Sequence, residues 1–302
     1  MTSKIYVAGA GGMLGEAIHK IFKDSYILKC SDIDKNETWI DYLDFREFDL
    51  YKKDVEIFNP DYLFHIGAYT DLEYCELHED DTYMTNSISV ENAVNLSNSL
   101  NIPLIYISTA GIFDGSKDHY DDWDTPNPIC TYARSKHIGE VHVQNYSKTH
   151  LILRAGWMMG GGPKKDKKFI QKIMQQIKDG ATDLFIVNDK MGTPTYTHDF
   201  ANNMKILIEN EEWGTYNLVC DGLTDRLSVA KHLIKLLNLE SKVKVNVVNS
   251  DYWKKQYFAP RPKCERLINK KLNLKGMNKM RGWQECLDEY IKNYYSDYLP
   301  RP

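Results

Sequence analysis

Short apolar runs alternate with stretches of helical character through the first half of the chain. The runs cover residues 5–8, 26–29, 62–66, 104–108 and, after a further helical stretch, 151–154. Each run has the length of a buried strand. Strands that alternate with helices form βαβ units. The pattern therefore predicts a parallel sheet covered by helices.

The second half of the chain is mixed. Helical patterns cover residues 199–209, 228–237 and 283–295, and we find no internal repeat and no low-complexity linker. The whole pattern favours an α/β fold of the Rossmann type, in which a doubly wound parallel sheet is joined to a smaller C-terminal α/β lobe.

The length of the chain agrees with this division. A chain of 302 residues, 42% of them hydrophobic, can bury a large core and is long enough for one doubly wound domain and a smaller lobe. We expect residues 1–155 and 184–220 to form the dinucleotide-binding domain, and residues 156–183 and 221–302 to form the substrate-binding lobe.

Charge and cysteine content narrow the class of protein. A net charge of −4 gives no electrostatic case for nucleic acid, and we expect neither a signal peptide nor a membrane-spanning segment. The nine histidines show no metal-binding pattern. The cysteines are scattered without a C-x-x-C motif, so we expect reduced thiols and a cytoplasmic protein. They are Cys30, Cys75, Cys130, Cys220, Cys264 and Cys286.

A glycine cluster follows the first apolar run and leads into a helical pattern. Its members are Gly9, Gly11, Gly12 and Gly15. A dinucleotide-binding turn needs glycine because the backbone bends sharply, approaches a pyrophosphate closely and packs the next helix on the strand. The amides at the start of that helix then face the phosphates. The alternative is a tight strand-to-helix turn without a ligand.

Two further positions suggest proton chemistry. Tyr132 and Lys136 are four residues apart and would share one helix face. We expect the ammonium to lower the pKa of the phenol, which would let Tyr132 exchange a proton near neutral pH. Ser108 and Thr109 end an apolar strand at the sheet edge where ligands bind, although both could simply cap the strand–loop junction.

Ordered motifs extend through most of the chain. They are GAGGMLG at 9–15, PDYLF at 60–64, AYT at 68–70, CE at 75–76, ISTAGIFDG at 107–115, YARSK at 132–136, GE at 139–140, LRAGW at 153–157, GTPT at 192–195 and RP at 261–262. Together they resemble the extended short-chain dehydrogenase/reductase superfamily, and within it the dTDP-4-dehydrorhamnose reductase-like group. The ordered set is far more specific than any one motif.

The resemblance implies roles for individual residues. The catalytic residues would be Thr109, Tyr132 and Lys136. The residues that bind NADH or NADPH would be Gly9, Gly11, Gly12, Met13, Leu14, Gly15, Asp32, Asp44, Phe45, Ala68, Tyr69, Thr70, Tyr132 and Lys136. The residues that bind a nucleotide-sugar substrate would be Thr109, Ala110, Trp157, Lys168 and Arg261. The resemblance also implies that the protein forms a homodimer.

The chain departs from the family pattern at three places. The usual Asp-Tyr after the strand-end threonine is Ala110-Gly111, an asparagine two residues before the tyrosine is Cys130, and the usual Asn-Ser after Arg-Pro is Cys264-Glu265. The three catalytic residues remain while parts of the sugar pocket differ. These departures point to a related reductase with a shifted substrate.

Acidic residues between the second and third predicted strands bear on cofactor choice. Asp32 would repel a 2′-phosphate and so slightly favours NAD over NADP, whereas Asp34 fits an acidic surface loop equally well. Asp44 lies where the superfamily places an Asp against the adenine amine, but it could also cap a helix. Asn86 matches an asparagine tied to a proton relay in the superfamily.

Positive charge gathers in the segment after Gly160. Its four lysines could meet a substrate diphosphate, or they could form a solvated charge run, and we expect only Lys168 to have a functional role. Arg261 is the stronger phosphate candidate because a guanidinium binds two oxygens at once.

We therefore interpret the chain as an NAD(P)H-dependent reductase of a nucleotide-linked 4-keto-6-deoxy sugar, active in deoxysugar and surface polysaccharide biosynthesis. The alternatives are an NAD-dependent sugar-nucleotide epimerase and a non-catalytic, cofactor-binding regulatory subunit. A 4,6-dehydratase is disfavoured because Ala110-Gly111 lacks the acidic residues that elimination uses. The chemistry needs no metal.

Overall fold

A seven-stranded sheet forms the centre of the computed structural model, which describes residues 2–299. The strand order is β11-β6-β5-β4-β1-β2-β3, and every neighbouring pair is parallel. This sheet confirms the predicted Rossmann-type α/β fold. Its strands are β1 (Lys4–Ala8), β2 (Ile27–Asp32), β3 (Ile40–Tyr42), β4 (Tyr62–His65), β5 (Leu104–Thr109), β6 (His150–Ala155) and β11 (Gly214–Asn217).

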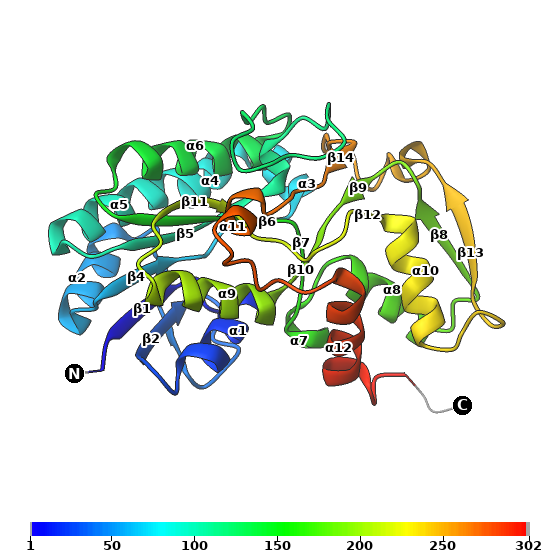
Figure 1. Ribbon diagram of the computed structural model, residues 1–302, viewed down its shortest axis with the longest axis horizontal. Coiled ribbons are helices and arrows are strands. Elements are labelled where there is room, and N and C mark those ends of the chain that lie inside the picture. The colour runs from blue at the N-terminus through cyan, green and yellow to red at the C-terminus, as the bar shows by residue number, and fades with distance from the viewer. Residues whose placement is uncertain (1, 300–302) are drawn as a thin grey trace.

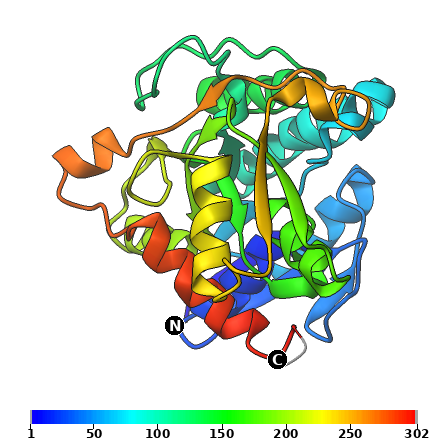
Figure 2. The ribbon, with the colours of Figure 1, turned by 90° about the vertical axis from the view of Figure 1, so that its right-hand side faces the viewer.

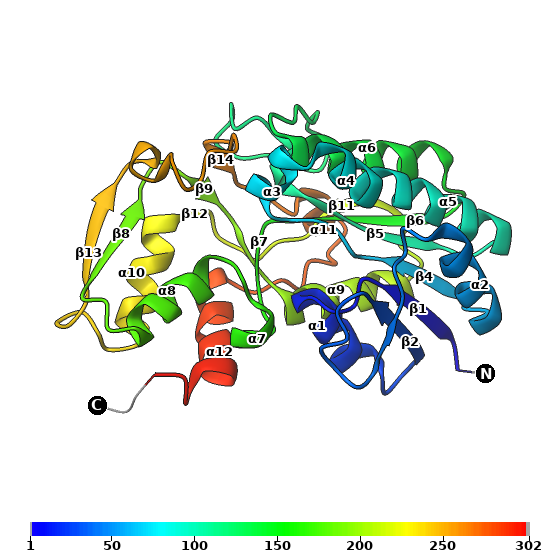
Figure 3. The ribbon, with the colours of Figure 1, turned by 180° about the vertical axis from the view of Figure 1, so that it is seen from behind.

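Helices cover both faces of this sheet (Figures 1 and 3). The side chains of β1 alternate between two hydrophobic clusters, with Ile5 and Val7 in one and Tyr6 and Ala8 in the other. A strand buried on both faces reads as a continuous apolar run, which is why the period-two pattern is missing. The first cluster includes α1 (Met13–Phe22) and α9 (Thr197–Glu209), and the second includes α2 (Phe48–Phe58), α5 (Ser89–Leu100) and α6 (Thr131–Tyr146).

Short elements connect β4 to α5 and β5 to α6. After β4 come α3 (Leu72–Leu77), α4 (Glu79–Tyr83) and a π-helical turn, η1 (Met84–Ile88); a 3₁₀ turn, η2 (Ala110–Ile112), follows β5. These connections leave the sheet at the carboxyl ends of its strands, where an open α/β sheet binds its ligands.

The smaller lobe contains three small sheets and several helices (Figures 1 and 2). One sheet pairs β7 (Trp157–Met159) with β10 (Pro194–Tyr196), and another has the order β12-β9-β14. The latter consists of β12 (Thr224–Asp225), β9 (Met191–Gly192) and β14 (Cys264–Glu265). The helices are α7 (Gly162–Lys165), α8 (Phe169–Lys178), α10 (Arg226–Leu236), η3 (Ser250–Trp253) and α12 (Trp283–Tyr295), whereas α11 (Lys270–Leu274) packs against β11 of the large sheet.

The third small sheet bears on the expected division of the chain. It pairs β8 (Asp183–Val187) with β13 (Lys244–Val248), apart from the seven-stranded sheet. The expected range 184–220 had assigned nearly all of β8, together with β9 and β10, to the dinucleotide-binding domain. The division itself stays a proposal, and we now place these three strands with the smaller lobe. In contrast, β11 lies in the large sheet, beside β6.

Candidate active site

The glycine turn has the close packing that the motif requires. Gly9 has φ +86°, and a Cβ atom there would lie 2.2 Å from the Cα of Gly67 in the loop after β4. A Cβ at Gly15 would lie 2.0 Å from the carbonyl oxygen of Ala10, so α1 packs tightly on the turn. Larger side chains are therefore excluded at both positions.

The first turn of α1 is open toward the space above the sheet edge. Gly12 is the N-cap residue, no side chain caps the helix, and a Cβ at Gly12 would meet no atom within 4 Å. Met13 and Leu14 begin the helix. Uncapped helix amides bind phosphate groups, so the turn fits the pyrophosphate of a dinucleotide.

Asp32 lies at the end of β2, beside this turn. Its Oδ2 accepts a hydrogen bond from the Gly11 amide at 2.8 Å, and its Oδ1 accepts one from the Asp34 amide at 2.8 Å. The Asp32 carboxylate thus stabilises the glycine turn. It does so from the position at which the resemblance places the residue that binds the cofactor ribose.

The smaller lobe also reaches this end of the site. Lys165 of α7 donates hydrogen bonds to the carbonyl of Gly11 at 3.3 Å and to Asn36 Oδ1 at 2.9 Å, while Asn36 Nδ2 donates to the same Gly11 carbonyl at 2.9 Å. Lys164 is paired with Glu37 at 2.9 Å. We did not identify Asn36 or Lys165 from the sequence, because a lysine run usually indicates a solvated face.

The predicted adenine-side residues follow β3. Asp44 accepts hydrogen bonds from the amide, Nε and Nη2 of Arg46, and these bonds hold the pKa of the Asp44 carboxyl below its usual value. Asp44 is not a helix cap, because Glu47 is the N-cap residue of α2. Phe45 packs against the buried His65, with ring centroids 4.7 Å apart.

Ala68, Tyr69 and Thr70 follow β4 at the carboxyl edge of the sheet. Asn86, in the π-helical turn η1, accepts a hydrogen bond from the Tyr69 amide at 2.9 Å and donates to its carbonyl at 3.0 Å. Asn86 also donates to Ser135 Oγ of α6 at 3.1 Å. This asparagine therefore joins the loop after β4 to the helix that carries Tyr132.

Thr109 and Tyr132 meet at the end of β5. Both side chains lie beside Gly111: a Cβ atom there would be 3.4 Å from Thr109 Oγ1 and 3.7 Å from Tyr132 Cε1, and Thr109 Oγ1 accepts a hydrogen bond from the Gly111 amide at 3.1 Å. Thr109 thus caps η2, and its role in holding a substrate oxygen stays a prediction. Ser108 does not cap the junction: its buried hydroxyl has no hydrogen-bond partner within residues 2–299.

Lys136 lies one helical turn beyond Tyr132 and is buried. Its Nζ is 4.2 Å from the centroid of the Tyr106 ring. Burial lowers the pKa of Lys136 to about 7, against the opposing charge of Glu140. Burial also raises the pKa of Tyr132. The expectation that Lys136 lowers the pKa of Tyr132 is therefore wrong for this structure, because burial is the largest effect and the charges that act on the phenol belong to neighbours such as Glu265, not to Lys136.

The predicted substrate residues lie where the smaller lobe faces the sheet edge. Ala110 is buried in η2. Lys168 Nζ donates hydrogen bonds to the carbonyl and hydroxyl of Thr70, at 2.9 and 3.0 Å. Arg261 forms a two-pronged ion pair with Glu73 of α3, at 2.7 and 2.8 Å. Lys168 and Arg261 thus already bridge the two parts of the molecule.

Trp157 lies between two charged residues that we did not select from the sequence. Its Nε1 donates a hydrogen bond to Glu265 Oε2 at 2.9 Å, and the Arg226 guanidinium carbon is 3.6 Å from the centroid of its ring. Glu265 was noted only as a departure from the family pattern. Arg226 gave no signal in the sequence, because it follows a two-residue strand far from every motif.

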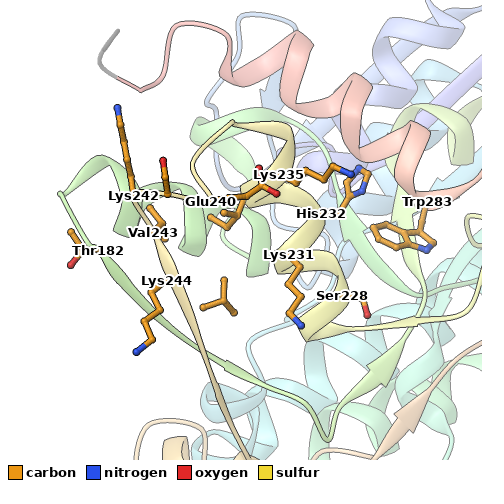
Figure 4. A pocket seen from close by; sticks show the side chains of 13 residues that line it. Thr182, Ser228, Lys231, His232, Lys235, Glu240, Lys242, Val243, Lys244 and Trp283 are labelled. Carbon is orange, nitrogen blue, oxygen red and sulfur yellow. The ribbon is translucent and has the colours of Figure 1, made fainter.

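A separate cavity of about 690 Å³ lies in the smaller lobe. Figure 4 shows side chains of α10 and β13 around it, among them Lys231, His232 and Lys244. Its lining contains none of the residues of the glycine turn, nor Thr109, Tyr132 or Lys136. The catalytic candidates therefore belong to a different part of the molecule.

Other features of residues 2–299 bear on the class of protein. No group of three or more histidine, cysteine or acidic side chains there is arranged to hold a metal ion. All six cysteines are buried and free. No helix in that range is both long and apolar enough to cross a membrane.

Comparisons with known proteins give a consistent result. A family model described as the RmlD substrate binding domain matches residues 3–296. The spore coat polysaccharide biosynthesis protein SpsK of Bacillus subtilis is 26% identical over 292 residues, which cover 96% of this chain and 97% of SpsK.

Two solved structures are similar over nearly their whole length. A dTDP-4-dehydrorhamnose reductase from Clostridium acetobutylicum has a TM-score of 0.87 and 28% identity, covering 96% of this chain and 99% of that one. The enzyme of that name from Bacillus anthracis, in complex with NADP, has a TM-score of 0.86 and 26% identity, covering 97% of this chain and 100% of that one.

Proposed function

Because the chain belongs to the RmlD substrate-binding domain family, we propose that it is an NAD(P)H-dependent reductase of the 4-keto group of a nucleotide-activated 4-keto-6-deoxy sugar. Relatives of this fold are named dTDP-4-dehydrorhamnose reductase, and one of them was solved with NADP. The name of SpsK suggests that the product enters a surface polysaccharide.

One observation carries this proposal. The side chains of Thr109 and Tyr132 lie next to each other beside Gly111 at the carboxyl end of β5, one helical turn from the buried Lys136. They lie on the sheet edge that also carries the open, uncapped first turn of α1. A proton donor is thereby placed beside a site suited to a dinucleotide.

When bound, the nicotinamide cofactor supplies hydride to the carbonyl carbon of the sugar. Tyr132 donates a proton to the carbonyl oxygen as that oxygen becomes an alkoxide, and Thr109 holds the same oxygen by a hydrogen bond. The raised pKa of Tyr132 keeps the phenol protonated and ready to donate at neutral pH. Lys136 orients the nicotinamide ribose and, when protonated, stabilises the phenolate that remains.

Cofactor and substrate contacts complete the proposal. The cofactor would be held by the glycine turn with Met13 and Leu14, by Asp32, by Asp44 and Phe45, by Ala68, Tyr69 and Thr70, and by Tyr132 and Lys136. The substrate would contact Thr109, Ala110, Trp157, Lys168 and Arg261. The burial of the glycine turn against β4 and the uncapped α1 support the first set.

Location and assembly are further parts of the proposal. Six buried free thiols suit a reducing compartment, which supports the cytoplasm. A homodimer follows from the superfamily resemblance, and light scattering on the purified protein measures it directly.

The test is oxidation of NADH and NADPH by purified protein with the dTDP-, UDP-, GDP- and CDP-linked 4-keto-6-deoxy sugars, compared with Tyr132→Phe. We expect turnover with one sugar nucleotide and a loss of about 100-fold or more in kcat for the variant, because general acid catalysis has that size. Nearly full turnover by Tyr132→Phe, with normal cofactor binding, would refute the mechanism. Bound NAD that survives purification, together with no net oxidation, would favour an epimerase.

A further inference from the structure

The carboxylate of Glu265 faces the catalytic hydroxyls. The position that a Cβ atom would take at Gly111 is 3.4 Å from Glu265 Oε1, 3.4 Å from Thr109 Oγ1 and 3.7 Å from Tyr132 Cε1. Glu265 Oε2 is occupied by the indole N–H of Trp157, whereas Oε1 has no hydrogen-bond donor within residues 2–299. A free carboxylate oxygen thus converges with Thr109 and Tyr132 on one small space.

On the other side of Trp157, Arg226 keeps its hydrogen-bonding capacity. Its guanidinium lies between the rings of Trp157 and Phe169, 3.6 and 4.5 Å from their centroids. Within residues 2–299 the guanidinium has no ion pair and no hydrogen bond. Burial lowers the pKa of Arg226 to about 10, so it stays charged at neutral pH. Stacking fixes its plane and leaves the N–H edge for a ligand.

The fold brings these groups together through one small sheet. β9 is the middle strand of the order β12-β9-β14, and its Gly192 lies against the Trp157 ring, where a Cβ would be 2.2 Å from the indole. Arg226 directly follows β12, and Glu265 ends β14. The two charged residues therefore flank a tryptophan that has no room to shift toward β9.

Two other cationic side chains near Trp157, those of Arg261 and Lys190, already have hydrogen-bond partners. Arg261 is paired with Glu73 through both of its terminal nitrogens. Lys190 Nζ donates to the carbonyls of Arg261 and Pro262, at 2.9 and 3.3 Å. Arg226 is thus the cation beside Trp157 that has donors to spare.

We infer that Arg226 and Glu265 determine which substrate this chain accepts: the Arg226 guanidinium binds an oxygen of the nucleotide diphosphate, and the free Glu265 oxygen accepts a hydrogen bond from a sugar hydroxyl near the ketone. This inference rests on the reductase function proposed above. These residues follow the substrate from its ketone to its diphosphate. Thr109 and Tyr132 would lie at the ketone, Glu265 and Trp157 beside the sugar, and Arg226 at the diphosphate. A sugar diphosphate with its ketone at Tyr132 presents its anionic end toward Arg226.

The first test compares Arg226→Met and Arg226→Lys with the wild type. Methionine keeps an apolar chain between the rings and removes the charge. We expect Arg226→Met to raise KM for the sugar nucleotide and to weaken binding of the matching nucleoside diphosphate by about 10- to 100-fold, because a charge-assisted hydrogen bond is lost. The affinity for NADPH should stay unchanged. Arg226→Lys should be intermediate, since lysine lacks the planar fork.

Binding of the nucleoside diphosphates can be measured without turnover. Calorimetric titration with dTDP, UDP, GDP and CDP measures the Arg226 contact directly, and NADPH binding shows that each variant is folded. Lys231→Met is the matched control, because Lys231 lies on the same helix and lines the separate cavity. A diphosphate affinity of Arg226→Met within twofold of the wild type, or a wild type that binds none of the four, would overturn the Arg226 assignment.

The second test is Glu265→Gln, which keeps the size of the side chain and an oxygen for Trp157. We expect a rise in KM for the sugar nucleotide of about 10-fold. An unchanged KM would overturn the role of Glu265. A wild type without reductase activity would instead refute the proposed function.

Discussion

Lys136 shows how far burial can change a residue that a motif identifies. Tyr132 and Lys136 share a helix face, as their spacing predicts, but the pKa of Tyr132 moves in the opposite direction from our expectation. The four-residue spacing is visible in the sequence, whereas the water removed from around the lysine depends on β5 and η1 packing over α6. Local spacing therefore identified the residues without giving their ionisation.

The lowered pKa of Lys136 predicts a pH dependence of stability. The ordinary value is 10.5 and the folded value is about 7, so between these limits the unfolded chain binds one more proton than the folded chain. Stability should consequently rise with pH through this window. We expect the free energy of unfolding of the wild type, measured relative to that of Lys136→Met, to increase from about pH 7 to about pH 9. Tyrosine does not yet ionise in this range.

Urea unfolding of both proteins at several pH values measures this difference. The exposed Lys167→Met is the control, and its difference from the wild type should not change with pH. Parallel curves for the wild type and Lys136→Met would contradict the lowered pKa.

At the scale of elements, a buried ion pair fixes α6 against β6. Arg154 of β6 donates through Nε and Nη2 to Glu140 of α6, and through Nη1 to the carbonyl of Asp122. Both charged side chains are almost fully buried. Because α6 also carries Tyr132 and Lys136, this pair sets the position of the catalytic helix on the sheet.

We predict that Glu140→Gln lowers the free energy of unfolding by about 3 kcal/mol, because it leaves the Arg154 charge buried without its partner. The double variant Glu140→Met with Arg154→Met should be less destabilised than Glu140→Gln, since two apolar side chains leave no buried charge. Denaturant unfolding of the wild type and the two variants tests the order. If Glu140→Gln were as stable as the wild type, the Arg154–Glu140 ion pair would not be what holds α6 on the sheet.

The elements themselves could largely be predicted from the sequence. The apolar runs give the buried strands, with shifts of one to three residues, and the helices at α9, α10 and α12 are found at nearly the expected residues. The π-helical turn at Met84–Ile88 was not predicted, because nothing in a local pattern distinguishes it from an α-helix. Yet it places Asn86 against Tyr69 and Ser135.

At the scale of the whole molecule, the site is assembled from segments that are far apart in the chain. The motifs supplied Thr109, Tyr132 and the glycine turn. Arg226, Glu265, Asn36 and Lys165 could not be found in this way, because each is defined by a partner at a large sequence separation: Trp157 for the first two and Gly11 for the others.

The positions of the α7 lysines lead to a prediction about how the protein distinguishes NADPH from NADH. Lys164 and Lys165 place positive charge beside the loop after β2, where Asp32 alone would disfavour a 2′-phosphate. We expect the double variant Lys164→Met, Lys165→Met to lose affinity for NADPH about 10-fold more than affinity for NADH, because a phosphate pairs with cations. Fluorescence titration with both cofactors measures this. Equal losses for the two would mean that α7 only stabilises the turn.

The return of β11 to the large sheet affects how the molecule can be divided. The chain leaves the sheet after β6, builds much of the smaller lobe, and comes back with α9 and β11 before it departs again. The first hydrophobic cluster is likewise continuous from α1 to α10 and α12. No single cut of the chain therefore releases an intact nucleotide-binding half. Two parts that are tied together by several chain crossings share one core, so neither part can be exchanged for another as a cassette.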